Sequence, residues 1–242
     1  MAVAEERDQL KTIGIIGGMS WESTVTYYQH INRSVKAALG GLHSAKVIVY
    51  SVDFADMAQR QGAGDWQGAA QDLIHCAQAL SKAGAEACVI ATNTMHKVAG
   101  EVASAIDIPL LHIADATGTA LQNDGRRKPA LLGTRFTMEE AFYRAKLERD
   151  YGLEVMTPAV TDREVIHRVI YEELCVGQLE DASREAYRSI IKKLVAQGAD
   201  SVILGCTEIP LLINQGDVEV PLYDTTALHA QAAVEFALAE AG

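Results

Sequence analysis

Short apolar runs alternate with longer amphipathic segments along most of the chain. The runs at residues 12–17, 46–52 and 86–91 each end at glycines or polar residues. A short apolar run bounded by turn residues is typical of a buried parallel strand. Residues 65–83 instead carry apolar side chains at three- and four-residue spacing, which predicts an amphipathic helix. This alternation predicts an α/β fold.

The same pattern assigns most of the other elements. Gly84 suits the C-terminal end of the 65–83 helix, and Thr137 and Glu140 have the spacing of a capping box at a helix start. Polar loops are expected around residues 60–62 and 162–163. Further helices are expected at residues 21–39, 97–105, from 137, at 165–174, at 183–197 and from 227, and further strands at 110–113, 130–133, 154–157 and 221–226.

Two stretches of the chain are copies of one pattern. Residues 84–96 and 198–210 both run from Gly-Ala-acid through a short apolar run to small polar residues. The shift that aligns them places Thr92 on Cys206, and nearly the same shift places Pro109 on Pro221. The repeat predicts two pseudo-symmetric α/β lobes, each a mostly parallel sheet flanked by helices, with the active site in the cleft between them. We expect the first lobe at residues 12–116, with residues 222–242 packing back on it, and the second at residues 117–221.

Thr92 and Cys206 each follow the apolar run of their copy. Open parallel sheets bind ligands just past the carboxyl ends of their strands, so we expect both residues in the cleft. Cys206 also precedes an expected helix, whose N-terminus would lower the pKa of the thiol and favour the thiolate. A thiolate opposite a second proton-carrying group suits racemisation, in which one group removes an α proton and the other returns one to the opposite face.

Composition narrows the class of protein. The 242 residues carry a formal net charge of −11, which argues against a nucleic-acid partner. The chain lacks the run of about 18 apolar residues that a membrane span needs, and residues 1–11 are charged, unlike a secretory signal. The four cysteines lack metal-site spacing, so we expect no metal and a reduced, cytoplasmic protein. No lysine stands in a turn that suggests pyridoxal phosphate.

Three motifs together resemble those of a known family. They are Gly17-Gly18-Met19-Ser20, Asn93-Thr94-Met95-His96 and Gly205-Cys206-Thr207-Glu208. On these motifs the chain, over almost its whole length, resembles the cofactor-independent aspartate/glutamate racemases. The resemblance implies two pseudo-symmetric lobes, no cofactor, an acidic amino acid as substrate, and a homodimer.

The resemblance also implies the catalytic pair. Cys206 matches the second cysteine of the family, but the first cysteine, which precedes Asn-Thr-x-His, is replaced by Thr92. A threonine hydroxyl is a poor base, yet it can donate a proton to a carbanion if it is resupplied. The chain resembles the L-specific branch of the family, which implies that Cys206 removes the α proton of L-aspartate or L-glutamate and Thr92 donates. Those substrates differ by one methylene, worth roughly 1–3 kcal/mol, and the sequence leaves the choice open.

Other residues near these motifs are candidates for holding the substrate or for supporting the acid/base pair. Glu208 and His96 could orient or activate the pair, or instead cap helices. Arg163 is a candidate for binding the side-chain carboxylate, against the alternative of a solvated surface arginine. His229 falls in an expected helix and is assigned a packing or surface role. The expected substrate-binding residues are Met19, Ser20, Gln61, Asn93, Thr94, Thr134, Thr207 and Glu208.

Two alternatives remain open. A decarboxylase of a malonate-type acid, or a cis–trans isomerase of a dicarboxylate, could use the same fold with a single working cysteine, and the replacement at Thr92 keeps that possibility. A non-catalytic protein that binds amino acids would keep the cleft without the chemistry. Retention of Cys206 in its motif favours catalysis.

Overall fold

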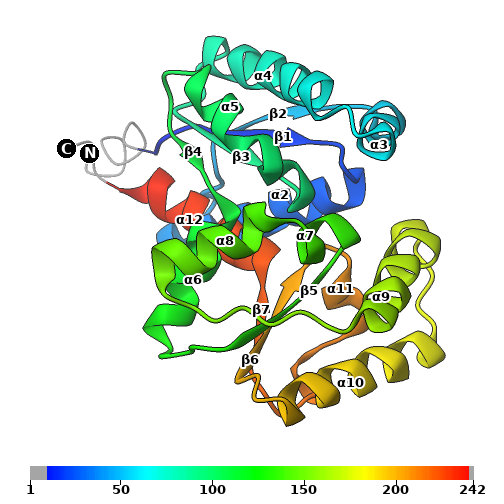
Figure 1. The fold of residues 1–242 in the computed structure, drawn as a ribbon. Coiled ribbons are helices and arrows are strands. Elements are labelled where there is room, and N and C mark those ends of the chain that lie inside the picture. The colour runs from blue at the N-terminus through cyan, green and yellow to red at the C-terminus, as the bar shows by residue number, and fades with distance from the viewer. Residues whose placement is uncertain (1–9, 240–242) are drawn as a thin grey trace. The chain divides into compact units, whose positions relative to one another are not determined.

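The computed structural model describes residues 10–239, which form two compact units (Figure 1). The first contains residues 10–112 and 229–239, and the second contains residues 113–228. Each unit is built on its own parallel sheet flanked by helices, as the alternating pattern predicted. The charged segment at residues 1–11 lies almost wholly outside the described residues.

The first unit holds a four-stranded parallel sheet in the order β2-β1-β3-β4. Its strands are β1 (Ile13–Gly17), β2 (Val47–Ser51), β3 (Ala87–Ile90) and β4 (Leu110–Leu111). The two central strands, β1 and β3, are buried along their whole length, and burial on both faces explains their continuous apolar sequences. β2 is an edge strand and is partly exposed.

Helices cover both faces of this sheet. Ile13 and Ile15 point to the face covered by α2 (Trp21–Leu39) and by the end of α12 (Thr225–Leu238). Ile16, on the opposite face, packs in the cluster that includes α4 (Trp66–Lys82). The remaining helices of the unit are α3 (Phe54–Ala63), η2 (Thr94–Val98) and α5 (Ala99–Ser104).

The second unit repeats this topology with fewer paired residues. Its parallel sheet has the order β5-β6-β7, formed by Pro129–Gly133, Ser201–Gly205 and Leu222–Asp224. On the free side of β5, Ala130 forms one isolated parallel bridge with Met156, where β2 lies in the first unit. The expected strand at 154–157 is therefore reduced to a single bridge. The common strand order supports the internal repeat.

Two pairs of helices sandwich the second sheet. α6 (Ile113–Asn123) and α8 (Ala141–Tyr151) cover the face that carries Leu131 and Ile203. α9 (Val160–Glu172) and α10 (Asp181–Ala196) cover the other face. The short helices of the unit are α7 (Arg135–Glu139), η3 (Leu174–Val176), α11 (Ile209–Leu212) and η4 (Gln215–Asp217).

Helical elements replace two of the expected loops. Residues 60–62 lie in α3, which Asp53 caps by accepting a hydrogen bond from the Ala55 amide, and which Gly64 ends in a left-handed conformation. Residues 162–163 lie in the first turn of α9. Both segments belong to amphipathic helices, although Gln61 is buried, and their polar sequences resemble those of loops.

Two expected boundaries were also wrong. The strand expected at 110–113 ends at Leu111, and α6 starts at Ile113, so the lobe boundary expected after residue 116 falls inside that helix. Thr137 does not cap a helix, because it lies within α7 and donates its amide hydrogen bond to Thr134, the true N-cap. Glu140 instead stands between α7 and α8.

Candidate active site

The strand ends of the first unit bring together most of the residues expected there. β1 and β3 are parallel neighbours, with Ile16 paired to Ile90, so the segments that follow them leave at the same edge of the sheet. After β1 comes the turn with Met19 and Ser20, and after β3 comes Thr92. Thr92 is partly exposed, whereas its neighbours on both sides are buried.

The turn after β1 is shaped by glycine and by hydroxyl groups. Gly18 has a φ of +91°, and a Cβ atom there would collide with the carbonyl oxygen of Val52. Its amide donates to Oγ1 of Thr24 at 2.8 Å. Ser20 caps α2 by accepting from the Ser23 amide at 3.4 Å. Only glycine fits this turn, and the turn delivers Ser20 to the sheet edge.

Gln61 reaches the same edge from α3. Its Nε2 atom lies 3.1 Å from Sδ of Met95, in η2, and the side chain is buried. Met19 and Met95 belong to one apolar cluster with the sheet. Gln61, Met19 and the 92–95 segment therefore occupy one part of the first unit, although Gln61 comes from a helix and not from the loop expected from the sequence.

A cluster of histidines supports Thr92, in which His96 and His229 are buried and His112 is half-buried. Nδ1 of His96 lies 2.8 Å from the carbonyl oxygen of Thr92, and the ring centroid of His96 is 4.6 Å from that of His112 and 5.6 Å from that of His229. Nε2 of His229 lies 2.7 Å from the carbonyl oxygen of Leu111, and its Nδ1 is 2.8 Å from the Tyr27 hydroxyl.

These contacts fix the chemistry of the histidine cluster. Carbonyl oxygens only accept, so Nδ1 of His96 and Nε2 of His229 carry protons, and Tyr27 donates to His229. Burial lowers the pKa of His96 well below 6.5, helped by the nearby His112 and His229. The neutral ring of His96 thus anchors the backbone of Thr92. The sequence pointed to His96 and placed His229 in a helix but did not identify Tyr27, whose partner His229 lies on a distant helix.

The second unit carries a corresponding set of residues at its own strand ends. Thr134 follows β5 and caps α7, accepting from the Thr137 amide at 3.4 Å, as Ser20 does from Ser23. The Thr134 and Thr137 hydroxyls are 3.2 Å apart, the same separation as in the Ser20–Ser23 pair. Cys206 directly follows the buried strand β6. The two caps extend the internal repeat to side-chain contacts.

Cys206 is engaged with a carboxylate. Its Sγ atom donates to Oε2 of Glu208 at 2.8 Å, and the Thr207 hydroxyl donates to the same oxygen at 2.8 Å. Cys206 is 8% exposed and Glu208 is buried as well. Burial raises the pKa of the Cys206 thiol well above its usual value, and the negative charge of Glu208 adds to the increase.

This finding corrects the expected state of the thiol. The sequence predicted that a helix N-terminus would favour the thiolate of Cys206. The helix that follows, α11, starts only at Ile209 and spans four residues, so it does not offset burial and the Glu208 charge. At rest Cys206 is a protonated thiol beside a base that can receive its proton.

Arg163 is held by other groups. Its Nε lies 3.1 Å from Oε1 of Glu139, and its Nη1 donates to the carbonyl oxygen of Pro158 at 3.0 Å. An ion-paired arginine would need to exchange Glu139 for a substrate carboxylate. The contacts therefore favour a structural role for Arg163.

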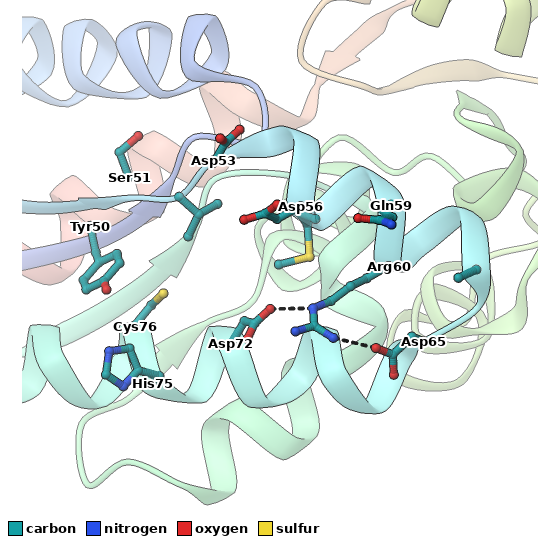
Figure 2. Close-up of a pocket in the computed structure, with 13 residues that line it drawn as sticks. Tyr50, Ser51, Asp53, Asp56, Gln59, Arg60, Asp65, Asp72, His75 and Cys76 are labelled. Atoms are coloured by element: carbon teal, nitrogen blue, oxygen red, sulfur yellow. Dashed lines mark hydrogen bonds and ion pairs between the residues drawn. The ribbon is translucent and has the colours of Figure 1, made fainter.

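A cavity of about 750 Å³ lies elsewhere on the first unit, between β2, α3 and α4. Figure 2 shows Arg60 between Asp65 and Asp72, with Nε 2.7 Å from the Asp72 carboxylate. Asp53 and Asp56 also line it, whereas none of the expected site residues does. Four carboxylates and one ion-paired cation would repel an acidic amino acid, so we do not assign this cavity to the substrate.

The described residues contain no group of three or more metal-binding side chains. Among the helices described, none is long and apolar enough to cross a membrane. The four cysteines, all within the described residues, are thiols that form no disulfide.

Comparisons with known proteins agree with the motifs. The chain is 25% identical to the broad specificity amino-acid racemase RacX of Bacillus subtilis (strain 168), over 94% of this chain and 98% of that protein. The structure matches that of a candidate Asp/Glu racemase from Yersinia pestis with a TM-score of 0.90 and 58% identity, over 95% of this chain and 100% of the other.

A second solved structure, PH1733, an aspartate racemase homologue from Pyrococcus horikoshii OT3, matches with a TM-score of 0.81 and 38% identity over 94% of this chain and 99% of the other. The family model of the Asp/Glu/hydantoin racemases matches residues 16–233, which span the strand ends of both units. The chain therefore belongs to the Asp/Glu/hydantoin racemase family.

Proposed function

We propose that the protein is a cofactor-independent racemase of aspartate, glutamate or both, which works by two-base proton transfer and starts preferentially from the L-enantiomer. The observation that carries the proposal is the Cys206 thiol at the end of β6, hydrogen-bonded at 2.8 Å to Glu208. In the repeat its counterpart is Thr92 at the end of β3. The proposal requires that both strand ends act on one bound substrate.

Proton transfer would begin at Cys206. Its thiol proton moves to Oε2 of Glu208, and the resulting thiolate removes the α proton of the L-amino acid. The Thr92 hydroxyl delivers its proton to the opposite face of the carbanion. Glu208 then releases its proton to solvent, and the Thr92 oxygen recovers one, which restores the starting state.

The neighbouring polar groups would hold the substrate. Ser20, Asn93 and Thr94 at the edge of the first sheet, and Thr134 and Thr207 at the edge of the second, offer hydroxyl or amide donors suited to carboxylates. The net charge of −11 makes such local donors necessary for an anionic substrate. Met19 and Gln61 would complete the wall beside Thr94.

The rest of the proposal concerns the setting of the enzyme. The chemistry of Cys206 needs a free thiol, which suits a reduced, cytoplasmic compartment. The acidic charge supports neither a nucleic-acid partner nor binding to an anionic membrane. We propose that the enzyme is a homodimer.

Exchange of the α hydrogen in D₂O tests the chemistry. Each pure enantiomer of aspartate and glutamate is incubated with enzyme, and deuterium incorporation is followed with a chiral assay of the products. The expected result is faster exchange from the L-form and its loss in Cys206→Ala, with Cys76→Ala, a buried cysteine on α4, as the matched control. Faster exchange from the D-form would overturn the preference.

The threonine at position 92 favours one other candidate, a single-cysteine decarboxylase or dicarboxylate isomerase of the same fold. Such an enzyme would release carbon dioxide from a malonate-type acid, or interconvert dicarboxylate isomers, without α exchange in amino acids. Substrate binding that persists in Cys206→Ala, with no activity in the wild type, would instead indicate a binding protein.

A further inference from the structure

Exposed apolar side chains gather on one part of the first unit. Ten large hydrophobic side chains are exposed in the described part of the chain, and six of them lie between residues 21 and 49. Three lie in the N-terminal half of α2: Trp21 is 64% exposed, Val25 43% and Tyr28 51%. Their spacing of four and then three residues places them on one stripe of the helix, and Leu39 continues it. We call these four residues the α2 seam.

The α2 seam borders the edge strand β2. Oδ1 of Asn32, which lies on the same stripe, accepts from the amide of Ala45 just before β2 at 3.1 Å. Val47 packs in the cluster beneath α2, so Val49, two residues further along β2, points to the same face and is 41% exposed. Val49 and α2 thus lie on the same face of the first sheet.

The charges beside the α2 seam have a matching order. Glu22, Gln29 and Lys36 follow one another at heptad spacing along one flank, and all three are exposed. Within the described chain, neither Glu22 nor Lys36 forms an ion pair. In an antiparallel pair of identical helices, Glu22 of each would lie opposite Lys36 of the other, and Gln29 would lie near the two-fold axis. Trp21 would then approach Leu39 of the second copy.

We propose that α2 is the contact helix of a two-fold symmetric homodimer, in which the α2 seams of two copies pack antiparallel. The order of charges favours a second copy of this chain over another partner, because Glu22 and Lys36 make the surface complementary to itself in this arrangement. The edge strand with Val49 widens the contact beyond one helix. The inference locates the homodimer proposed above and does not depend on racemase activity, which is measured separately.

The mass in solution is the first test. Light scattering after gel filtration, over a range of concentrations, should give twice the chain mass of 26.1 kDa. Val25→Asp and Tyr28→Glu should each raise the dimer dissociation constant roughly tenfold or more. Leu179→Glu, an exposed leucine in the second unit, is the matched control and should leave it unchanged. Far-UV circular dichroism checks that each variant folds.

Charge reversal tests the antiparallel register. Glu22→Lys and Lys36→Glu each create like-charged pairs and should weaken the dimer, whereas the double variant should restore it. Gln29→Cys should form a disulfide-linked dimer under mild oxidation, and Gln197→Cys in the second unit should not. A monomeric wild type, or a dimer unaffected by the Val25 and Tyr28 variants, would overturn the proposal. Failure of the double variant to restore association would overturn the antiparallel register.

Discussion

The Cys206 thiol donates to the Glu208 carboxylate at 2.8 Å, and both side chains are buried at the end of one parallel strand. Glu208 accepts the hydrogen bond of the thiol, which fixes the position of Cys206 and places a proton acceptor beside it. Because burial and the Glu208 charge both raise the pKa of the thiol, Cys206 rests protonated, and the proposed mechanism requires it to lose its proton during each turnover. Its reactivity therefore depends on Glu208.

Glu208→Gln separates the two effects of this carboxylate. Loss of the proton acceptor should lower kcat for L-aspartate by about 100-fold or more. Loss of the negative charge should lower the pKa of Cys206 toward its usual value, so alkylation by iodoacetamide at pH 8.5 should become faster. Stopped assays and mass spectrometry of the alkylated peptide measure both. Glu219→Gln, an exposed glutamate, is the control, and slower alkylation of Glu208→Gln would contradict this view.

Thr92→Cys should restore the missing base. A thiol at the end of β3 can remove a proton from the opposite face, so exchange in D₂O from D-aspartate should rise relative to exchange from L-aspartate. Thr92→Val keeps the size of the side chain but has no exchangeable proton, and it should abolish racemisation. A D-to-L ratio of exchange rates that is the same in Thr92→Cys and the wild type would exclude Thr92 as the proton donor.

His96 positions Thr92 through its Nδ1 proton, so replacing His96 by asparagine and by glutamine should have different effects. The side-chain nitrogen of asparagine can occupy the place of Nδ1 and keep the bond to the Thr92 carbonyl, whereas that of glutamine extends past it. His96→Gln should lower kcat roughly 10- to 100-fold more than His96→Asn, with a much smaller change in KM. Melting temperatures separate this effect from a loss of stability. Equal kcat values in the two variants would leave His96 with a packing role only.

The buried histidine cluster should also make stability depend on pH. The pKa of His96 is lowered in the folded protein, so the unfolded chain binds a proton first as the pH falls below 6.5. The contribution of the neutral His96 ring to the free energy of unfolding is complete above pH 6.5. It decreases as the pH falls toward the lowered pKa of His96 in the folded protein. Between pH 6.5 and 5 this should remove roughly 1–2 kcal/mol of unfolding free energy.

Urea titrations at pH 7.5 and 5.0 measure this loss. The pH dependence should be shallower in His96→Asn. The rings of His112 and His229 face that of His96, and Tyr27 is hydrogen-bonded to His229. His43→Asn controls for the loss of one imidazole elsewhere. If wild type and His96→Asn lose the same free energy between the two pH values, His96 is not the titrating group.

Local patterns were enough to predict α2, α4 and the positions of the main strands along the chain, because apolar periodicity and glycines at element ends are local signals. The predicted capping box at Thr137 was wrong because Thr134 and Thr137, three positions apart, could each start a helix. Only the position at which β5 ends decides between them. The loop predicted at residues 60–62 was wrong because the sequence of a short helix with a polar face resembles that of a loop.

The state of Cys206 could not be predicted from local sequence. Its position at the end of an apolar run located it, but burial and the orientation of Glu208 set its protonation, and both depend on packing. The same holds for Tyr27 and His229, which are neighbours only because α2 and α12 cover one face of the sheet. That Thr92 and Cys206 act on one substrate stays a prediction.

Gly205 offers a last test of how closely the core constrains the strand that precedes Cys206. A Cβ atom at this position would lie 2.8 Å from the Leu132 carbonyl oxygen and 2.9 Å from Cδ1 of Leu131, so β6 would have to move away from β5. Gly205→Ala should cost roughly 1–3 kcal/mol of unfolding free energy. It should also lower kcat, because Cys206 is the next residue.

Gly62, in α3, is the matched control for Gly205, since a Cβ atom at Gly62 would have no neighbour within 4 Å. Gly62→Ala should stabilise the protein by roughly 0.5–1 kcal/mol, because alanine loses less backbone entropy in a helix. Chemical denaturation and initial rates on both variants check this pair. A Gly205→Ala enzyme with unchanged stability and kcat would show that β6 moves without disturbing Cys206, and that the close approach of β5 and β6 does not set the position of the thiol.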